Sequence, residues 1–217
     1  MKGIVTILRF VPSIDRAPHY EDYSFDYIPG IKVLDVLHQV REKYDRDLSY
    51  RWGCRDGSCG LCGVMVDGQP ALVCKQEASR NMTLTPLAHL LPEKDLIVRR
   101  DSAEREFSFL PHFHPGSTTL PEARILDGRL ELRYLAGRCV NCRCCQAVCP
   151  VKRRHPHNFW GPALFARIAK ILFDPRNGGS HEAALEGSGI VKCVECGRCS
   201  AVCPHKADPC RLIAAMK

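Results

Sequence analysis

Three groups of four cysteines account for all but two of the fourteen cysteines in this 217-residue chain. In the first group four, two and eleven residues separate successive members, which are Cys54, Cys59, Cys62 and Cys74. The second and third groups both follow the pattern CxxCxxCxxxCP. Their members are Cys139, Cys142, Cys145 and Cys149, followed by Pro150, and Cys193, Cys196, Cys199 and Cys203, followed by Pro204. The first spacing is typical of plant-type 2Fe-2S ferredoxins with an early fourth ligand, and the others repeat the bacterial two-cluster run. The chain is therefore predicted to hold three iron-sulfur clusters and to conduct electrons.

The residues between these cysteines also suit iron-sulfur clusters. The stretch 53–63 contains many glycines, which permit positive φ and let backbone N–H groups approach the inorganic sulfides. A structural zinc site is the alternative for each group. Zinc would prefer two well-separated CxxC pairs, and it would leave the glycines and the prolines after Cys149 and Cys203 without a reason. Iron-sulfur ligation is the better interpretation.

The elements needed to position the first group form a β-grasp order. Alternating apolar residues predict two strands, and apolar residues at helical spacing predict a helix after Pro29-Gly30. Two short runs around Asp67-Gly68 predict a hairpin that returns Cys74 toward the cysteine loop. The predicted elements are strands 3–11 and 20–28, helix 33–43, strands 64–66 and 71–73, and a final strand 95–98.

The pattern changes near residue 100, and strand-like alternation stops. A segment rich in Pro, His and Thr covers 111–121. Pro162 suits the first turn of a helix whose apolar residues are Leu164, Phe165, Ile168, Ile171 and Leu172, and Asp208 with Pro209 predicts the cap and start of a last helix. The fold class is therefore predicted as α+β, with a β-grasp 2Fe-2S ferredoxin-like domain (1–100) followed by an α-helical bacterial ferredoxin-like domain (101–217).

Charge and hydropathy exclude several other classes. The formal net charge is +7, but each of the three oxidised clusters with its four thiolates carries about −2, so the loaded chain has a net charge of about +1. The most apolar run, 160–173, is interrupted by Arg167 and Lys170, so no transmembrane segment is expected. The first residues show no secretory signal, and such dense cysteine then favours a reducing cytoplasm over a disulfide framework.

Few other residues suggest chemistry. Cys144 and Cys210 are interpreted as small buried thiols and not as ligands. A basic patch follows the second cysteine group: Lys152, Arg153, Arg154, His155 and His157. It is interpreted first as a solvated face, with an acidic partner or anionic lipid head groups as the alternative, and its lack of interleaved aromatic residues disfavours nucleic acid. No nucleophile and base constellation, Walker loop or dinucleotide fingerprint is present, so no catalytic residue is predicted.

With the groups in this order, the chain resembles the iron-sulfur subunits of the succinate dehydrogenase and fumarate reductase family over nearly its whole length. The matching segments are Arg51-Trp52-Gly53-Cys54-Arg55-Asp56-Gly57-Ser58-Cys59-Gly60, Leu91-Pro92-Glu93-Lys94-Asp95-Leu96-Ile97-Val98, Gly161-Pro162-Ala163 and Cys203-Pro204-His205-Lys206-Ala207-Asp208-Pro209. The resemblance implies a non-catalytic electron-transfer subunit of an oxidoreductase, with the 2Fe-2S cluster near a separate FAD-carrying flavoprotein. It also implies that Cys139, Cys142, Cys145 and Cys203 hold one 4Fe-4S cluster, and that Cys149, Cys193 and Cys199 match the ligands of a third cluster, which is 3Fe-4S in most members.

Three positions depart from that family's pattern. Cys196 stands where most members have an apolar residue, and its fourth thiolate predicts a second 4Fe-4S cluster held by Cys149, Cys193, Cys196 and Cys199. A more electron-rich site predicts a lower potential within the range of roughly −700 to +450 mV open to protein clusters. Arg154 and Val194 occupy places where the family has a tryptophan and a histidine associated with quinone. Quinone chemistry at the usual site is therefore not expected.

These features predict a relay between a flavoprotein subunit and a second partner, which is either a quinone-linked membrane anchor or a cysteine-rich, heterodisulfide-reductase-like protein. The chain is expected in the cytoplasm or on the cytoplasmic face of the membrane, held there by its partners. The alternatives are the same relay serving a flavin dehydrogenase with another substrate and, remotely, a zinc-binding module for nucleic acid. The substrate and the direction of electron flow are determined by the partner subunits and not by this chain.

Overall fold

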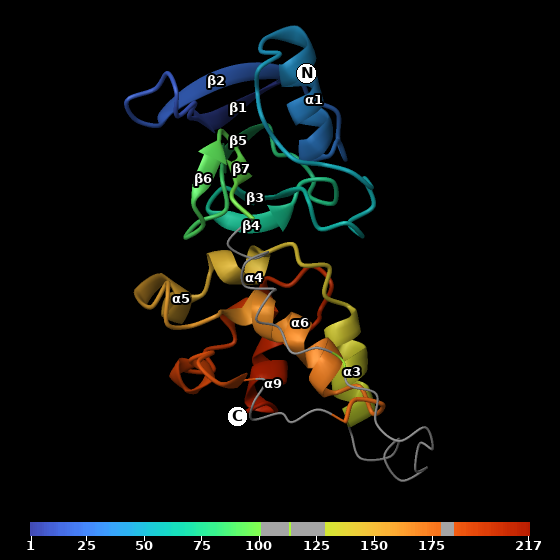
Figure 1. Cartoon of the computed structure of the whole chain (residues 1–217). Coiled ribbons are helices and arrows are strands. Elements are labelled where there is room, and N and C mark those ends of the chain that lie inside the picture. Colours follow the sequence, from blue (N-terminus) through green and yellow to red (C-terminus); the bar gives the residue numbers. More distant parts are fainter. Residues whose placement is uncertain (101–112, 114–128, 179–184) are drawn as a thin grey trace. The chain divides into compact units, whose positions relative to one another are not determined.

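The computed structural model describes residues 1–100, 113, 129–178 and 185–217, which form two compact units (Figure 1). The first unit comprises Met1–Arg99 together with Cys142–Ala147, and the second comprises Arg100–Asn141 and Val148–Lys217. The predicted boundary between residues 100 and 101 stays a prediction. The Pro-, His- and Thr-rich segment lies outside the described residues apart from Phe113.

A five-stranded mixed sheet with strand order β2-β1-β5-β3-β4 organises the first unit. β1 (Lys2–Arg9) pairs antiparallel with β2 (His19–Asp26) and parallel with β5 (Asn81–Thr85). β3 (Gly63–Val66) pairs antiparallel with β5 and with β4 (Gln69–Leu72). Strands β1 and β2, a helix, and then strands β3, β4 and β5 of the same sheet follow one another in the predicted β-grasp order.

Helix α1 (Val33–Lys43) follows the predicted bounds and covers this sheet with its apolar side. Its buried residues are Val33, Leu34, Val36, Leu37 and Val40. The first turn is also tied to the chain that follows β4: Val33 N–H donates to the Gln76 carbonyl at 3.0 Å, and Leu34 N–H donates to the Val73 carbonyl at 3.0 Å. The helix therefore fixes the segment that carries Cys74.

The strand predicted at Asp95–Val98 is wrong as the last strand of this sheet. Only Ile97–Val98 is extended (β7), and it pairs with β6 (Pro92–Lys94) in a separate two-stranded sheet. Asp95 has a positive φ of 46°, so it lies in the turn between these strands. The place beside β1 belongs to β5 instead, whose Met82 and Leu84 are buried between more exposed neighbours.

The second unit is helical, as predicted, and its core surrounds α6 (Pro162–Leu172). Among the described residues of this unit, the other helices are α3 (Arg129–Gly137), α5 (Pro150–Arg154), the 3-10 turn η2 (Ile190–Lys192), α8 (Arg198–Ala201) and α9 (Pro209–Ala214). α6 is buried on almost every side because alanines occupy the places between its large apolar residues, while Ile171 is half-buried. Asp208 caps α9 by accepting the Arg211 N–H at 3.3 Å. Among the described residues, no helix has the length and hydropathy needed to cross a membrane.

A buried carboxylate holds the C-terminal end of α6 to α3. The side chain of Asp174 is 7% exposed, and it accepts from Arg176 Nη2 at 2.8 Å and from Arg133 Nε on α3 at 3.5 Å. The hydrogen bond from Arg176 lowers the pKa of Asp174 to about 2, against the opposing effect of burial. A carboxyl group with a depressed folded-state pKa stabilises the fold above its unfolded pKa of about 4, and that stabilisation is lost as the pH falls toward about 2.

Asp174→Asn is therefore expected to lower the free energy of unfolding by about 2 kcal/mol. Because both pKa values lie below 5, the difference from wild type should stay constant from pH 8 to pH 5. Anaerobic urea denaturation followed by circular dichroism measures it. Glu131→Gln, which removes the acid of an exposed pair with Arg211, is the matched control and should have a far smaller effect. A difference that fades between pH 7 and pH 5 would contradict the role given to Asp174.

Candidate metal centres

The first cysteine group lies entirely in the first unit and is arranged as two pairs of sulfurs. The Cys59 N–H donates to Cys54 Sγ at 3.3 Å, and the Cys54 N–H donates to Cys59 Sγ at 3.5 Å. Cys62 Sγ and Cys74 Sγ are 3.4 Å apart and buried. The β3–β4 hairpin produces the second pair, because it turns at Asp67-Gly68 as predicted and the Val73 N–H donates to the Cys62 carbonyl at 3.1 Å.

The loop between these pairs has the backbone that a cluster requires. Gly57 and Gly60 have φ values of 91° and 67°, and Arg55 also has a positive φ of 63°. A Cβ added to Gly53 would lie 3.4 Å from Cys59 Sγ. Such a left-handed, side-chain-poor loop lets the main chain curl around an anion, so the residues present fit an iron-sulfur cluster.

Two thiols of this group, Cys54 and Cys62, differ in how readily they ionise. A hydrogen bond with Asp56 raises the pKa of Cys54, but hydrogen bonds from Ser58 and from the Cys59 N–H outweigh it and lower that pKa to about 7. Burial raises the pKa of Cys62 to about 12. Because thiolates and not thiols bind iron, metal binding at Cys62 must displace a proton. Cys54 thus offers a ready ligand, whereas Cys62 and Cys74 are shielded from water.

Two supports of this loop were not found from the sequence. Arg55 Nη2 forms an ion pair with Asp35 Oδ1 on α1 at 2.5 Å. His38, also on α1, hydrogen-bonds Tyr50 Oη through Nδ1 at 2.6 Å and packs edge-on against Trp52, with ring centroids 4.9 Å apart. Asp35 and His38 lie near the start and the middle of a predicted helix, which was the available signal. Both side chains brace the cysteine loop against α1.

The second cysteine group is distributed over the two units. Cys142 and Cys145 are buried in the first unit, where α4 (Cys144–Ala147) is also found. Cys139 and Cys203 are half-buried in the second unit, and Cys203 Sγ accepts the Ala207 N–H at 3.3 Å. Their assignment as one ligand set, Cys139, Cys142, Cys145 and Cys203, stays a prediction.

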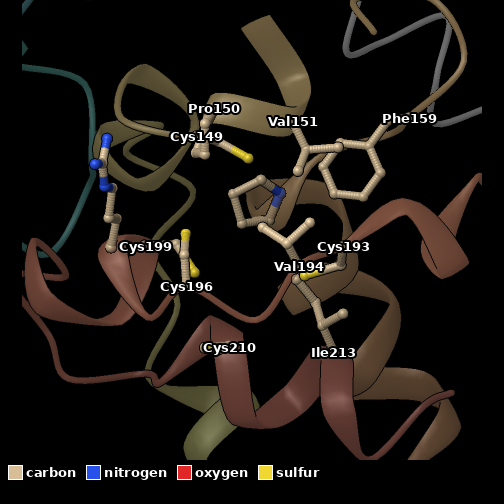
Figure 2. A pocket seen from close by; sticks show the side chains of 12 residues that line it. Cys149, Pro150, Val151, Phe159, Cys193, Val194, Cys196, Cys199, Cys210 and Ile213 are labelled. Atoms are coloured by element: carbon tan, nitrogen blue, oxygen red, sulfur yellow. The ribbon is translucent and has the colours of Figure 1, made fainter. Parts of the chain in front are cut away.

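One cavity in the second unit brings together cysteines from the second and third groups (Figure 2). Cys149, Cys193, Cys196 and Cys199 all line it, together with apolar side chains such as Val151. Cys149 Sγ accepts the Lys152 N–H from the first turn of α5 at 3.4 Å, which is the kind of hydrogen bond that stabilises a thiolate. Four sulfurs, an apolar lining and a backbone donor fit an iron-sulfur cluster.

The cavity is buried at one side and open at the other. Cys199 is buried, and burial, followed by the nearby thiols of Cys210 and Cys149, raises its pKa to about 12. Cys196 is exposed. The thiolate that distinguishes this chain from most of the family it resembles therefore stands at the solvent edge of the site.

The two remaining cysteines have different surroundings. Cys144 is fully buried in α4, as predicted. Cys210 was also predicted to be buried, but it is only half-buried and lines the same cavity as Cys149, Cys196 and Cys199. The reason is its place in the first turn of α9, where its N–H donates to Ser200 Oγ at 3.0 Å and directs that turn toward the third group.

Among the residues that the structure describes, no three or more His, Cys, Asp or Glu side chains are arranged for a single metal ion. This finding concerns single ions. The thiolates of a cluster are spread over several iron atoms, so cluster ligands need not converge on one point.

A glycine ahead of the third group is required by both its backbone and its surroundings. Gly189 has a φ of 68°, and a Cβ added to it would lie 2.1 Å from the Asn158 carbonyl oxygen. It directly precedes η2, which leads into Cys193. Gly189→Ala is expected to destabilise the second unit by more than the roughly 1–2 kcal/mol that a left-handed alanine costs, because the main chain must also move away from Asn158.

Anaerobic thermal unfolding and iron content measure this effect. Gly187→Ala is the matched control, since Gly187 has a nearly identical φ of 69° but nothing within 4 Å of an added Cβ. Gly189→Ala should lower the melting temperature more than Gly187→Ala and should release iron from the third site. Equal effects of the two substitutions would show that the close approach to Asn158 is unimportant.

Comparison with known proteins matches both parts of the chain. Residues 4–105 match the model of a 2Fe-2S iron-sulfur cluster binding domain, and residues 135–207 match that of a 4Fe-4S dicluster domain. The fumarate reductase iron-sulfur subunit of Haemophilus influenzae is 33% identical over 233 residues, which cover 96% of this chain and 89% of that protein. One subunit of the fumarate reductase (CoM/CoB) of Methanothermobacter marburgensis is 32% identical over 94% of this chain but only 41% of its own length.

A solved structure shares the same fold. A chain of the Mycobacterium smegmatis Sdh1 complex in the apo form superimposes with a TM-score of 0.87 at 26% sequence identity. The match covers 99% of this chain and 93% of that chain. The similarity therefore extends over both cluster-binding domains in the same order.

Proposed function

We propose, since this chain belongs to the iron-sulfur subunits of the succinate dehydrogenase and fumarate reductase family, that its twelve grouped cysteines hold one 2Fe-2S cluster and two 4Fe-4S clusters. The chain is an electron-transfer relay and not the catalytic subunit. When bound, iron-sulfur clusters take up and release single electrons. The residues of this chain hold them, shield them from water and set their environment.

The observation that carries the proposal is the cavity shared by two cysteine groups. Cys149 comes from the second group, whereas Cys193, Cys196 and Cys199 come from the third, and all four line one space. In bacterial two-cluster ferredoxins the last cysteine of each run ligates the cluster of the other run. By the same exchange, we assign Cys203 to the cluster of Cys139, Cys142 and Cys145. Cys54, Cys59, Cys62 and Cys74 are assigned to the 2Fe-2S cluster.

The proposed partners rest on two arguments: the family to which the chain belongs, and the positions at which its sequence differs from the family pattern. The homologues imply a flavoprotein subunit, and we propose that it carries FAD and passes electrons to or from the first site. For the second partner, Arg154 and Val194 favour a cysteine-rich, heterodisulfide-reductase-like protein over a quinone-linked anchor. The Methanothermobacter relative supports this choice, because its name couples fumarate reduction to CoM and CoB and it extends well beyond the region it shares with this chain. We place the complex in the cytoplasm or at the cytoplasmic face of the membrane, where a reducing environment preserves the thiols.

Anaerobic purification of the native complex tests this function. About ten irons per chain, a similar amount of acid-labile sulfide and a stoichiometric FAD protein are expected. Zinc without sulfide would end the assignment in favour of a zinc module. A stoichiometric flavoprotein that oxidises another substrate but not succinate would favour the alternative, in which the same relay serves a different dehydrogenase.

A further inference from the structure

The loop after Cys149 presents a set of exposed basic side chains. Arg153 and Arg154 end α5, and His155 and His157 follow; all four are exposed. Lys152, which the sequence places in the same patch, turns inward instead: its Nζ donates to the carbonyls of Pro156 at 2.8 Å and of Phe159 at 2.9 Å. Lys152 therefore shapes the loop, while the two arginines give the loop its charged surface.

This loop lies against the segment that leads into the third cysteine group. Lys192 Nζ donates to the Asn158 carbonyl at 3.1 Å, and the Trp160 N–H donates to the Ser188 carbonyl at 3.0 Å. Gly189 is packed against Asn158, so that an added Cβ would collide with it. The basic loop and the third cysteine loop thus form one continuous surface of the second unit.

The third cysteine loop adds apolar groups to this surface. Val191 is 81% exposed and Val194 is 66% exposed, and Val194 lines the same cavity as the exposed Cys196. Figure 2 shows Val194 beside Cys193 at the edge of that cavity. Arg198 also lines the cavity, so a cation stands next to the apolar patch.

One acidic side chain beside this surface, Glu195, is already paired with a cation. The Glu195 carboxylate forms an ion pair with Lys217 Nζ at 2.6 Å. We call the set Arg153, Arg154, Val191, Lys192, Val194 and Arg198 the exit face. It combines two exposed valines with four cations, and the exposed Cys196 lines the same cavity as Val194 and Arg198.

We propose that the exit face docks an acidic protein that carries its own redox centre, and that this protein is the second partner of the relay. The inference rests on the proposed function, since it assumes a loaded third site. Transient interfaces combine apolar and charged groups, as this surface does, and opposite charge on the partner would accelerate encounter. An anionic lipid surface would satisfy the same cations, but it could not exchange electrons with the cluster that we assign to the third site. Each docking transfers one electron, so the partner is reduced as this chain is oxidised, or the reverse during fumarate reduction.

Charge reversal on the exit face tests the proposal. An affinity tag at the amino terminus of this chain is used to purify the native complex at low salt from cells expressing wild type, Arg153→Glu with Arg154→Glu, or a control. The control is Arg16→Glu with Arg80→Glu, which makes the same change of charge at exposed positions of the first unit. The amount of each co-purified redox protein is quantified, and flotation with vesicles of phosphatidylcholine alone or with phosphatidylglycerol measures lipid binding.

The proposal predicts a stoichiometric redox protein with a net negative charge in the wild-type and control preparations. The exit-face variant should retain at least about tenfold less of this acidic protein, because charge reversal slows electrostatically steered association by about that factor or more. Added salt should also release the acidic protein from the wild-type complex, since salt screens the attraction between opposite charges. The iron-sulfur content and the amount of co-purified flavoprotein should be the same in the wild-type, exit-face and control preparations.

Other outcomes distinguish failure of the proposed relay function from failure of the proposed docking at the exit face. Loss of the flavoprotein from wild type would refute the proposed function and not the exit face alone. Equal retention of the acidic protein by the variant, or its absence from wild type with the flavoprotein present, would refute the exit face. Flotation of wild type, but not of the variant, only with phosphatidylglycerol vesicles would show that the surface binds lipid and would also overturn the proposal.

Discussion

Replacing Cys196 with alanine is expected to convert the third site from a 4Fe-4S to a 3Fe-4S cluster. Cys149, Cys193 and Cys199 would remain, and those three positions match the ligands of a 3Fe-4S cluster in the family that the chain belongs to. Iron content should fall from about ten to about nine per chain. The reduction potential of the third site should rise on the order of 100 mV, because a thiolate charge is lost next to the cluster and potentials respond to net charge and cluster type.

Low-temperature EPR of the oxidised protein, together with iron analysis, measures this conversion. Cys196 can lose its thiol without a large packing defect because it is exposed. Cys210→Ala is the matched control, since Cys210 lines the same cavity but is not assigned as a ligand. It should leave ten irons and no 3Fe-4S signal. The comparison thus separates loss of a ligand from loss of any thiol near the site.

Two results would contradict the assignment of Cys196. A 3Fe-4S signal in freshly isolated wild type, protected from air, would mean that the fourth thiolate does not bind. A 3Fe-4S signal in Cys210→Ala but not in Cys196→Ala would mean that Cys210 is the fourth ligand. The Cys210 variant is informative because the Cys210 thiol lies near the buried Cys199 and raises the pKa of the Cys199 thiol.

Local signals in the sequence predicted much of the fold. The helix Val33–Lys43, the turn at Asp67-Gly68, and the cap and start of α9 at Asp208 and Pro209 depend on residues close together in the chain. Cysteine spacing likewise predicted that Cys54, Cys59 and Cys62 share one loop. In each of these cases the physical cause of the structure is contained within a few neighbouring residues. The place of Cys149 in one cavity with the third group spans more than forty positions and was expected only from the two-cluster ferredoxin pattern.

Features that depend on distant residues were missed. β5 alternates polar and apolar residues, but its assignment depends on its parallel pairing with β1, which lies almost eighty positions earlier. The exposure of Cys196 and the half-buried position of Cys210 depend on how α9 packs near the third group. The inward turn of Lys152 depends on carbonyls that only the folded loop presents.

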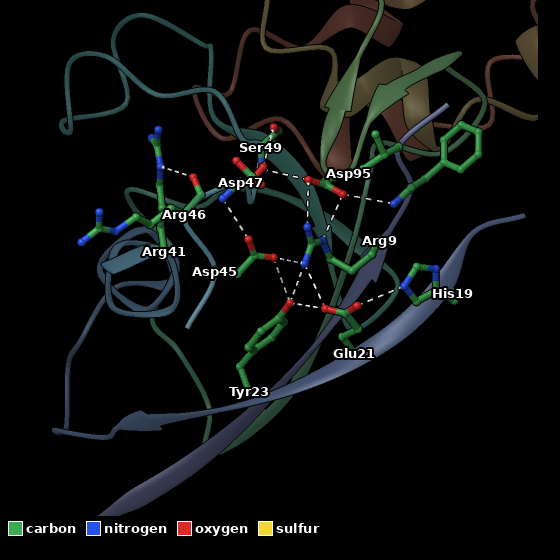
Figure 3. Close-up of polar contacts among 12 residues, drawn as sticks. Arg9, His19, Glu21, Tyr23, Arg41, Asp45, Arg46, Asp47, Ser49 and Asp95 are labelled. Carbon is green, nitrogen blue, oxygen red and sulfur yellow. Dashed lines mark hydrogen bonds and ion pairs between the residues drawn. The ribbon is translucent and has the colours of Figure 1, made fainter. Parts of the chain in front are cut away.

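Removal of the Asp95 carboxylate is expected to destabilise the first unit strongly. Asp95 and Arg9 form a buried pair at the centre of a polar network (Figure 3), with Arg9 Nε donating to Asp95 Oδ1 at 3.0 Å. The Asp95 side chain is 0% exposed and that of Arg9 is 7% exposed. Asp95 also accepts the N–H groups of Phe10 at 3.1 Å and Ser49 at 2.9 Å. Burial lowers the pKa of Arg9, but the hydrogen bond with Asp95 outweighs it, and the guanidinium stays charged.

Asp95→Ala should lower the free energy of unfolding by about 3–5 kcal/mol, the effect of removing one partner from a buried ion pair. Anaerobic urea denaturation followed by circular dichroism measures the change. Asp26→Ala is the matched control because Asp26 pairs with Lys2 at 2.8 Å and Lys43 at 2.5 Å at an exposed position, where removal should have a much smaller effect. Similar losses for the two variants would contradict the importance of burial.

The same substitution should also loosen the first metal site, because Asp95 holds the segment that enters the cysteine loop. Ser49, whose N–H it accepts, is followed at once by Tyr50, which hydrogen-bonds His38, and by Trp52, which packs on it. Without the carboxylate, Ser49 is no longer linked through Asp95 to Arg9 and Phe10, and the segment that leads to Cys54 is held less firmly. Asp95→Ala should therefore release the two irons of the 2Fe-2S site in mild urea before the other eight, whereas Asp26→Ala should not. Simultaneous release of all ten would show that the network stabilises the fold but does not position the loop.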